Sequence, residues 1–129
     1  MPTPLAELKQ AALVNALRSC QLFAGLAVTD LQQIAEFTLI KTMETGDYLF
    51  REQDASRGFY IVQNGAINVH RVNAAGKEQV IHVFRAGESF AEATLATDSG
   101  YPADARAVEN SNVLLVQKAG FLGLLRRYP

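Results

Sequence analysis

Few residues in this chain could carry chemistry. Glu92 is a carboxylate in a turn of small residues after Phe90, where a helix start would favour its negative charge. His70 and His82 lie in segments rich in Val and Ile, where an imidazole can contact a bound ligand. Cys20 is the only cysteine, so it forms no disulfide within the chain. No cationic neighbour in the sequence would lower the pKa of this thiol, and we read it as buried and unreactive.

Spacings typical of catalysis do not occur in the sequence. It contains no nucleophile elbow, no phosphate-binding loop and no acidic pair in a recognisable catalytic frame. No His or Cys lies at metal-finger spacing from Cys20. We therefore expect no enzyme activity, no catalytic residue and no metal-binding site.

Composition indicates one globular domain. The 129 residues are 49% hydrophobic and 19% charged, and the net charge is −1. The basic residues are scattered, and only Arg126 and Arg127 are adjacent, which argues against direct contact with DNA. No apolar run reaches the roughly 20 residues of a membrane helix, and no signal peptide is evident. We expect a cytoplasmic domain without a membrane segment.

The sequence pattern predicts helices at both ends of the chain. A second helix begins at Thr29, a good N-cap, and runs to about Glu36. A last helix begins near Lys118. We expect helices over 1–36 and the start of a helical segment over 118–129. The apolar residues of the first helix recur at helical spacing and form a stripe that we assign to the core: Leu5, Leu8, Ala12, Leu13 and Leu17.

Between the helices, residues 37–117 have the sequence pattern of an all-β domain. Short segments rich in Val, Ile, Phe and Tyr are separated by glycine-containing turns, of which Asn64-Gly65 is the strongest tight-turn signal. This spacing predicts a mostly β fold with flanking helices: a sandwich, a jelly roll or a barrel. The expected strands are roughly 37–43, 47–51, 58–63, 66–72, 79–84, 104–108 and 112–117.

The order of strands and glycine turns resembles the cyclic-nucleotide-binding domain of Crp/Fnr transcription regulators. The resemblance covers about Leu22 to Pro129, and it implies a double-stranded β-helix, that is, a jelly-roll-like β-roll. The motifs that carry it are Leu22-Phe23, Gly46-Asp47-Tyr48-Leu49-Phe50, Phe59-Tyr60-Ile61-Val62-Gln63-Asn64-Gly65, Gly76-Lys77-Glu78 and Gly87-Glu88-Ser89-Phe90-Ala91-Glu92.

The chain departs from this family where the cyclic phosphate should bind. The family has Phe-Gly-Glu and a later Pro-Arg-x-Ala, whose backbone N–H groups and arginine hold the phosphate. Here Ala91 replaces the glycine, and with Ala103 in the place of the final alanine, Tyr101 stands at the arginine position. Strand alternation places Arg106 on the outer face as a solvated charge. Cyclic nucleotide binding is thus disfavoured, because a buried phosphate without a cation is costly. The alternative is a genuine cAMP- or cGMP-binding module of a regulator, kinase or channel.

The variant motifs resemble the Dnr/Nnr-type branch, which responds to nitric oxide or low oxygen. They are Phe90-Ala91-Glu92-Ala93 and Tyr101-Pro102-Ala103-Asp104-Ala105-Arg106-Ala107. This resemblance implies a small-molecule or gas effector, with haem as a candidate cofactor. A single cysteine excludes the iron–sulfur centre of Fnr itself. The predicted effector pocket comprises His82, Phe90, Ala91, Glu92, Ala93, Tyr101 and Ala103.

Several of these assignments have two interpretations. His82 either contacts a pocket ligand or haem, or is an ordinary strand histidine, and His70 is a second candidate haem ligand. Glu92 either binds a ribose hydroxyl or only favours a helix start. Tyr101 either stacks on a ligand or covers the core with its ring.

The resemblance also implies partners. In the full-length protein we expect a homodimer and DNA binding through a C-terminal domain that this chain lacks. The remaining alternative is an interaction domain with an empty pocket.

Overall fold

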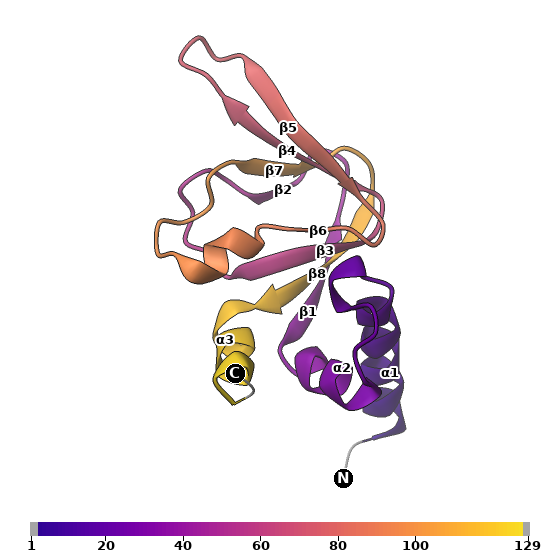
Figure 1. Cartoon of the computed structure of the whole chain (residues 1–129). Helices are drawn as coiled ribbons and strands as arrows, with labels where there is room; N and C mark the ends of the chain where they lie inside the picture. Colours follow the sequence, from indigo (N-terminus) through magenta and orange to yellow (C-terminus); the bar gives the residue numbers. More distant parts are fainter. Residues whose placement is uncertain (1–2, 128–129) are drawn as a thin grey trace.

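Helices precede and follow the strands in the computed structural model, which describes residues 3–127 (Figure 1). The helical elements are α1 (Pro4–Arg18), the 3-10 helix η1 (Gln21–Phe23), α2 (Val28–Ala35), the 3-10 helix η2 (Glu92–Ala96) and α3 (Lys118–Arg127). The strands are β1 (Thr38–Met43), β2 (Tyr48–Phe50), β3 (Gly58–Asn64), β4 (Ala66–Val72), β5 (Glu78–Arg85), β6 (Ser89–Phe90), β7 (Asp104–Ala107) and β8 (Ser111–Gln117).

The predicted fold class is confirmed: two antiparallel four-stranded sheets form a β-roll with flanking helices. The first sheet has the order β1-β8-β3-β6 and the second has the order β2-β7-β4-β5. The seven expected strands are present, and β6 is an eighth that the sequence pattern did not reveal. It has only two residues, which are too few to show an alternation.

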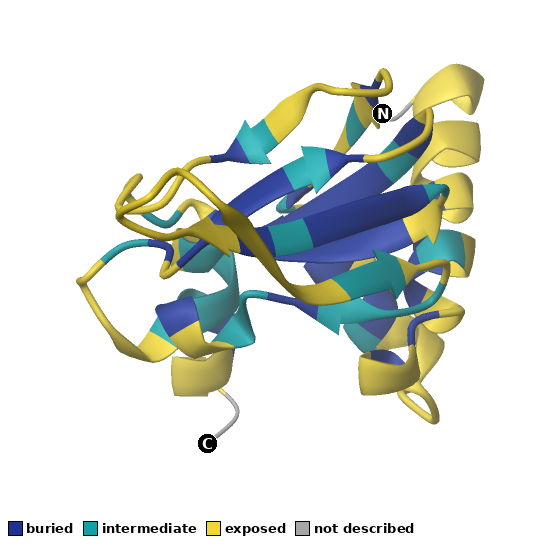
Figure 2. Ribbon diagram, turned by 90° about the horizontal axis from the view of Figure 1, so that it is seen from above, coloured by how far each residue is buried: buried dark blue, intermediate teal, exposed yellow. Residues whose placement is uncertain are grey.

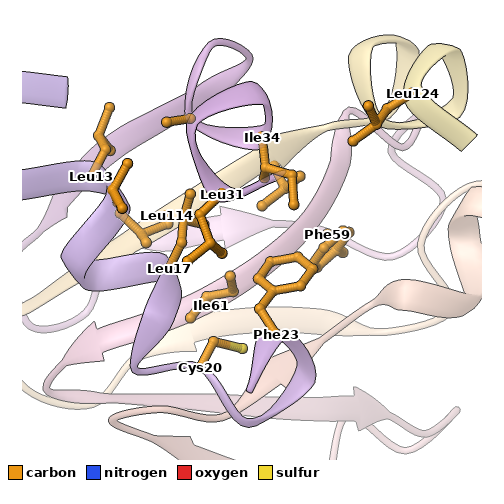
Figure 3. Packing of buried hydrophobic residues seen from close by; sticks show 13 residues of the cluster. Leu13, Leu17, Cys20, Phe23, Leu31, Ile34, Phe59, Ile61, Leu114 and Leu124 are labelled. Carbon is orange, nitrogen blue, oxygen red and sulfur yellow. The ribbon is translucent and has the colours of Figure 1, made fainter. Parts of the chain in front are cut away.

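The central strands β3 and β8 of the first sheet are buried on both faces, which explains the continuous apolar run of β3. Side chains alternate, so that Phe59 and Ile61 face the helices whereas Tyr60 and Val62 face the inside of the roll. Figure 2 shows these central strands as the most deeply buried part of the molecule. Figure 3 shows how residues of α1, η1 and α2 pack on the helix side of the sheet.

The N-terminal helices differ from their prediction in two details. α2 begins at Val28 with Ala27 at the N-cap position, so Thr29 lies inside the helix and does not cap it. In α1, Leu13 and Leu17 are buried, but Leu5 and Leu8 are largely exposed. Ala12 is exposed as well, so of the predicted core stripe only Leu13 and Leu17 are buried, where they join the core cluster that contains Ile61 and Leu114.

The Asn64-Gly65 turn is a corner between the sheets and not a hairpin. β3 and β4 belong to different sheets, and Gly65 with φ 92° carries the chain from one to the other. A Cβ on Gly65 would collide with the Ser111 side chain, whose hydroxyl accepts a hydrogen bond from the Ala66 N–H at 3.0 Å. The hairpin of this region is β4–β5, and its outer part, residues 71–82, is exposed and projects from the roll (Figure 1).

Candidate effector-binding site

The segment between β6 and β7 carries most residues of the predicted effector pocket, and we call it the cassette. It begins with a tight turn at Ala91. Ala91 has φ 70° and immediately precedes η2. The turn is closed because the Thr94 hydroxyl donates a hydrogen bond to the Ala91 carbonyl at 2.7 Å. Positive φ is a conformation that glycine adopts without strain. Ala91 thus adopts a left-handed conformation that is more usual for glycine.

A small apolar cavity lies under this turn. Its volume is about 110 Å³, and no charged or hydrogen-bonding side chain lines it. Sites for drug-sized ligands usually measure about 300–1,000 Å³ and carry a few polar groups. The cavity offers neither the space nor the charge that a nucleotide requires. It is lined by Phe50, Val69, Ile81, Phe84, Phe90, Ala91, Pro102 and Ala103.

Tyr101, which the sequence analysis predicts to stand at the family's arginine position, is buried inside the roll. The residue is 1% exposed, and its ring stacks on Phe50 with centroids 3.7 Å apart and planes at 10°. Its hydroxyl donates to the Gly58 carbonyl at 2.9 Å and accepts from the Arg57 N–H at 3.1 Å. Of the two interpretations of Tyr101, this geometry is that of a ring covering the core.

Other aromatic rings fill the space beside Tyr101. Phe90 stacks on Phe84 at 4.8 Å and on Tyr60 at 5.6 Å. Burial, followed by the neighbouring Tyr101, raises the pKa of Tyr60. The interior of the roll is thus occupied by stacked side chains of its own.

The other predicted site residues lie around this interior. His82 shares a face with Phe84, and their ring centroids are 4.5 Å apart, but its side chain is 53% exposed at the rim. Its Nε2 is 3.6 Å from Glu88 Oε2. Glu92 is partly buried at the start of η2, and Ala93 is exposed. The structure thus gathers Phe90, Ala91 and Ala103 at the small cavity, with Tyr101 behind it, and places His82, Glu92 and Ala93 outside its lining.

Arg106 is not the free solvated charge that alternation suggested. It pairs with Glu78 through two hydrogen bonds, of 2.6 and 3.1 Å, and also donates to the Tyr48 hydroxyl at 3.2 Å. Hydrogen bonding to Arg106 lowers the pKa of Glu78. The pair joins β7 to β5 across the outer face, so Arg106 is already engaged and points away from the cavity.

Two residues near the cassette have surroundings that the sequence analysis did not predict: His70, which it considered only as a ligand contact, and Arg71, which it did not name. His70 is fully buried, with Nδ1 3.1 Å from Asn68 Oδ1 and with Nε2 lacking a hydrogen-bond partner among the described residues. Nε2 lies 3.8 Å from Asp104 Oδ2 and 3.7 Å from Glu78 Oε1. Arg71 donates from Nε to the Pro102 carbonyl at 2.9 Å. The sequence carries no signal for these contacts, because they depend on how β4 pairs with β5 and β7.

No metal site emerges from this geometry. Within residues 3–127, no group of three or more His, Cys, Asp and Glu side chains could hold a metal ion. Over the same residues, no helix is both long and apolar enough to cross a membrane.

Cys20 belongs to the helix-side core, where it is completely buried. Desolvation by that burial raises the pKa of the thiol above its ordinary value. We expect a thiol reagent such as 5,5′-dithiobis(2-nitrobenzoate) to label the native protein on the order of 100-fold more slowly than the urea-unfolded protein. Equal labelling rates before and after unfolding would show that Cys20 is accessible and able to act as a redox sensor.

An antiparallel roll with a strand–turn–3-10 helix cassette over a cavity has the architecture of a jelly-roll ligand-binding domain. The profile of the family described as the cyclic nucleotide-binding domain matches residues 40–128, and the chain belongs to this family. It is the Crp/Fnr type of that domain.

Known proteins resemble the chain over most of its length. The cyclic AMP receptor protein of Thermus thermophilus is 26% identical over 113 residues, which are 88% of this chain and 52% of that protein. The neuropathy target esterase sws of Drosophila willistoni is 32% identical over 120 residues, 88% of this chain but only 8% of the esterase. The crystal structure of the sensor domain of the transcriptional regulator DNR from Pseudomonas aeruginosa superposes with a TM-score of 0.82 at 27% identity, covering 91% of this chain and 79% of that one. The chain therefore spans about half of the Thermus protein and a small part of the esterase.

Proposed function

We propose that this chain is the effector-sensing domain of a Crp/Fnr-type transcription regulator and that its family pocket does not accept cyclic nucleotides. The observation that carries the proposal is Tyr101, a buried ring with both hydroxyl hydrogen bonds satisfied, at the position of the phosphate-binding arginine. A phosphate placed in the 110 Å³ cavity would meet only apolar side chains and would lose its hydration without compensation.

The cassette motifs support a signal of the Dnr/Nnr type, namely nitric oxide or a redox change. The likeness to the DNR sensor domain, at 27% identity, points the same way. We further propose that regions outside this chain supply the DNA-binding domain and the homodimer contact, since the chain spans only about half of a relative of this type.

Haem does not fit the cavity described above. The cavity is too small for the macrocycle, His82 lies at the rim with its side chain exposed, and His70 is buried against two carboxylates. We therefore assign no role to haem inside the roll. An absorption spectrum of the purified protein titrated with haemin tests this point, and a ligated haem spectrum that disappears in His82→Ala would contradict it.

Isothermal calorimetry with cAMP and cGMP tests the proposal. We expect no binding by the unaltered chain at nucleotide concentrations of tens of micromolar. The double variant Tyr101→Arg with Ala91→Gly restores a charge-assisted contact worth about 1.5–3 kcal/mol. It should therefore bind about one to two powers of ten more tightly than the matched control Tyr101→Gln with Ala91→Gly. Circular dichroism verifies that both variants fold.

The genuine cyclic-nucleotide module is the alternative function, favoured by the match to the Thermus cyclic AMP receptor protein. Micromolar cAMP binding by the unaltered chain would establish it and overturn the proposal. The anion would then have to contact a cation near the cassette, and Arg71, hydrogen-bonded to the Pro102 carbonyl, is the first residue to replace in that case.

A further inference from the structure

A second and larger cavity lies on the opposite side of the Phe50–Tyr101 stack. Its volume is about 430 Å³, within the range of ligand sites, whereas the family pocket measures about 110 Å³. Phe50 lines both cavities and therefore lies between them, and Tyr101, which stacks on Phe50, lines the larger one. The larger cavity is lined by Lys41, Leu49, Phe50, Asp54, Ala55, Arg57, Tyr60 and Tyr101.

The charges in this cavity favour an anion. Lys41 and Arg57 line it, and neither side chain makes a hydrogen bond or an ion pair with another described residue. The one carboxylate of the lining, Asp54, already accepts the Arg51 N–H at 2.9 Å through Oδ2. Two unengaged cations thus face one partly engaged carboxylate, and the balance of charge is positive.

The loop between β2 and β3 is held firmly at the cavity edge. Its Gln53 has φ 76°, which is strained for a residue with a side chain. The loop is fixed to the cassette because the Gln53 N–H donates to the Tyr101 carbonyl at 2.8 Å and the Tyr101 N–H donates to the Asp54 carbonyl at 3.0 Å. Strain of this kind persists only where the surroundings enforce it, and it concentrates at ligand sites.

We propose that this cavity is a binding site for a small organic anion with a phosphate or carboxylate head and an apolar body. Lys41 and Arg57 pair with the head, and the apolar body packs on the Leu49, Tyr60 and Tyr101 side. The site goes beyond the proposed function, because it is separate from the family pocket. A ligand here contacts Tyr101, whose backbone belongs to the cassette. Ligand binding would therefore also change the environment of the cassette backbone.

An NMR titration of the ¹⁵N-labelled chain tests the site with phenyl phosphate, benzoate and the neutral benzyl alcohol. We expect saturable shifts at the amides of Lys41, Ala55, Arg57 and Tyr101 with phenyl phosphate or benzoate, at a Kd on the order of 1 mM or below for ligands of this size. Benzyl alcohol should bind at least tenfold more weakly. The two anionic probes distinguish a phosphate site from a carboxylate site.

Charge-removing variants provide the control. Lys41→Gln with Arg57→Gln should weaken binding of the better anion at least tenfold. Lys77→Gln with Arg126→Gln removes the same charge from exposed positions and should leave binding unchanged. Absence of saturable shifts, shifts confined to Phe84, Ala91 and Ala103, or equal weakening in both double variants would overturn the proposal. None of these outcomes depends on whether the family pocket excludes cyclic nucleotides, which calorimetry decides.

Discussion

Replacing Tyr101 with alanine is expected to lower the free energy of unfolding by about 3–5 kcal/mol. The substitution removes a fully buried ring stacked on Phe50, and it leaves the Arg57 N–H and the Gly58 carbonyl without their partner. Urea unfolding followed by circular dichroism measures the loss. This large effect follows because the tyrosine ring is a packed structural part of the roll.

Tyr101→Phe is the matched control for the hydroxyl. It keeps the ring and removes only the two hydrogen bonds, so the expected loss is about 1–3 kcal/mol. A loss below about 1 kcal/mol for Tyr101→Ala would mean that the ring is not packed as described. A loosely packed ring would not block the pocket, so it could not explain the exclusion of nucleotides.

Gly58→Ala is expected to destabilise the protein by about 4 kcal/mol or more, or to prevent folding. Gly58 begins β3, has φ 150° and pairs with Gln117 of β8. A Cβ at this position would overlap the backbone carbonyl of Val116. Relief would require β3 and β8 to separate, and these strands form the doubly buried centre of the first sheet.

Gly76→Ala provides the comparison at a glycine with open surroundings. Gly76 has φ 80° in the exposed tip of the β4–β5 hairpin, and a Cβ there would meet no atom within 4 Å. Only the backbone strain remains, at about 1–2 kcal/mol. Equal effects of the two substitutions on the urea midpoint would show that the close approach of β3 and β8 is not what constrains Gly58.

Much of the fold could be predicted from the sequence, because strand periodicity and turn glycines are local signals. The buried faces of β3 and β8 appear as unbroken apolar runs, and the alternation that predicts an outward Arg106 leaves Ala105 and Ala107 on the buried face of β7. The two-residue β6 and the corner at Gly65 were not predicted, because strand length and sheet membership depend on distant partners.

The site was harder to predict than the fold, for a similar reason. Ile81 is an extra residue in β5, since Val69 pairs with His82 while the next residue, His70, pairs with Val80. Such a bulge interrupts strict alternation, and Ile81 lines the small cavity while His82 lies at its rim. Likewise, the Arg106–Glu78 pair joins residues that are 28 positions apart, a distance over which no local pattern operates.

We propose that the side chains of this chain close the pocket in which its family holds a cyclic nucleotide. The most direct test is an amide-resolved NMR titration of the unaltered chain with cAMP. We predict no saturable shifts at the amides of Phe84, Ala91 and Ala103, which surround the small cavity. Saturable shifts at all three amides with a micromolar Kd would show that the Phe50–Tyr101 stack opens for the nucleotide, and would contradict the account.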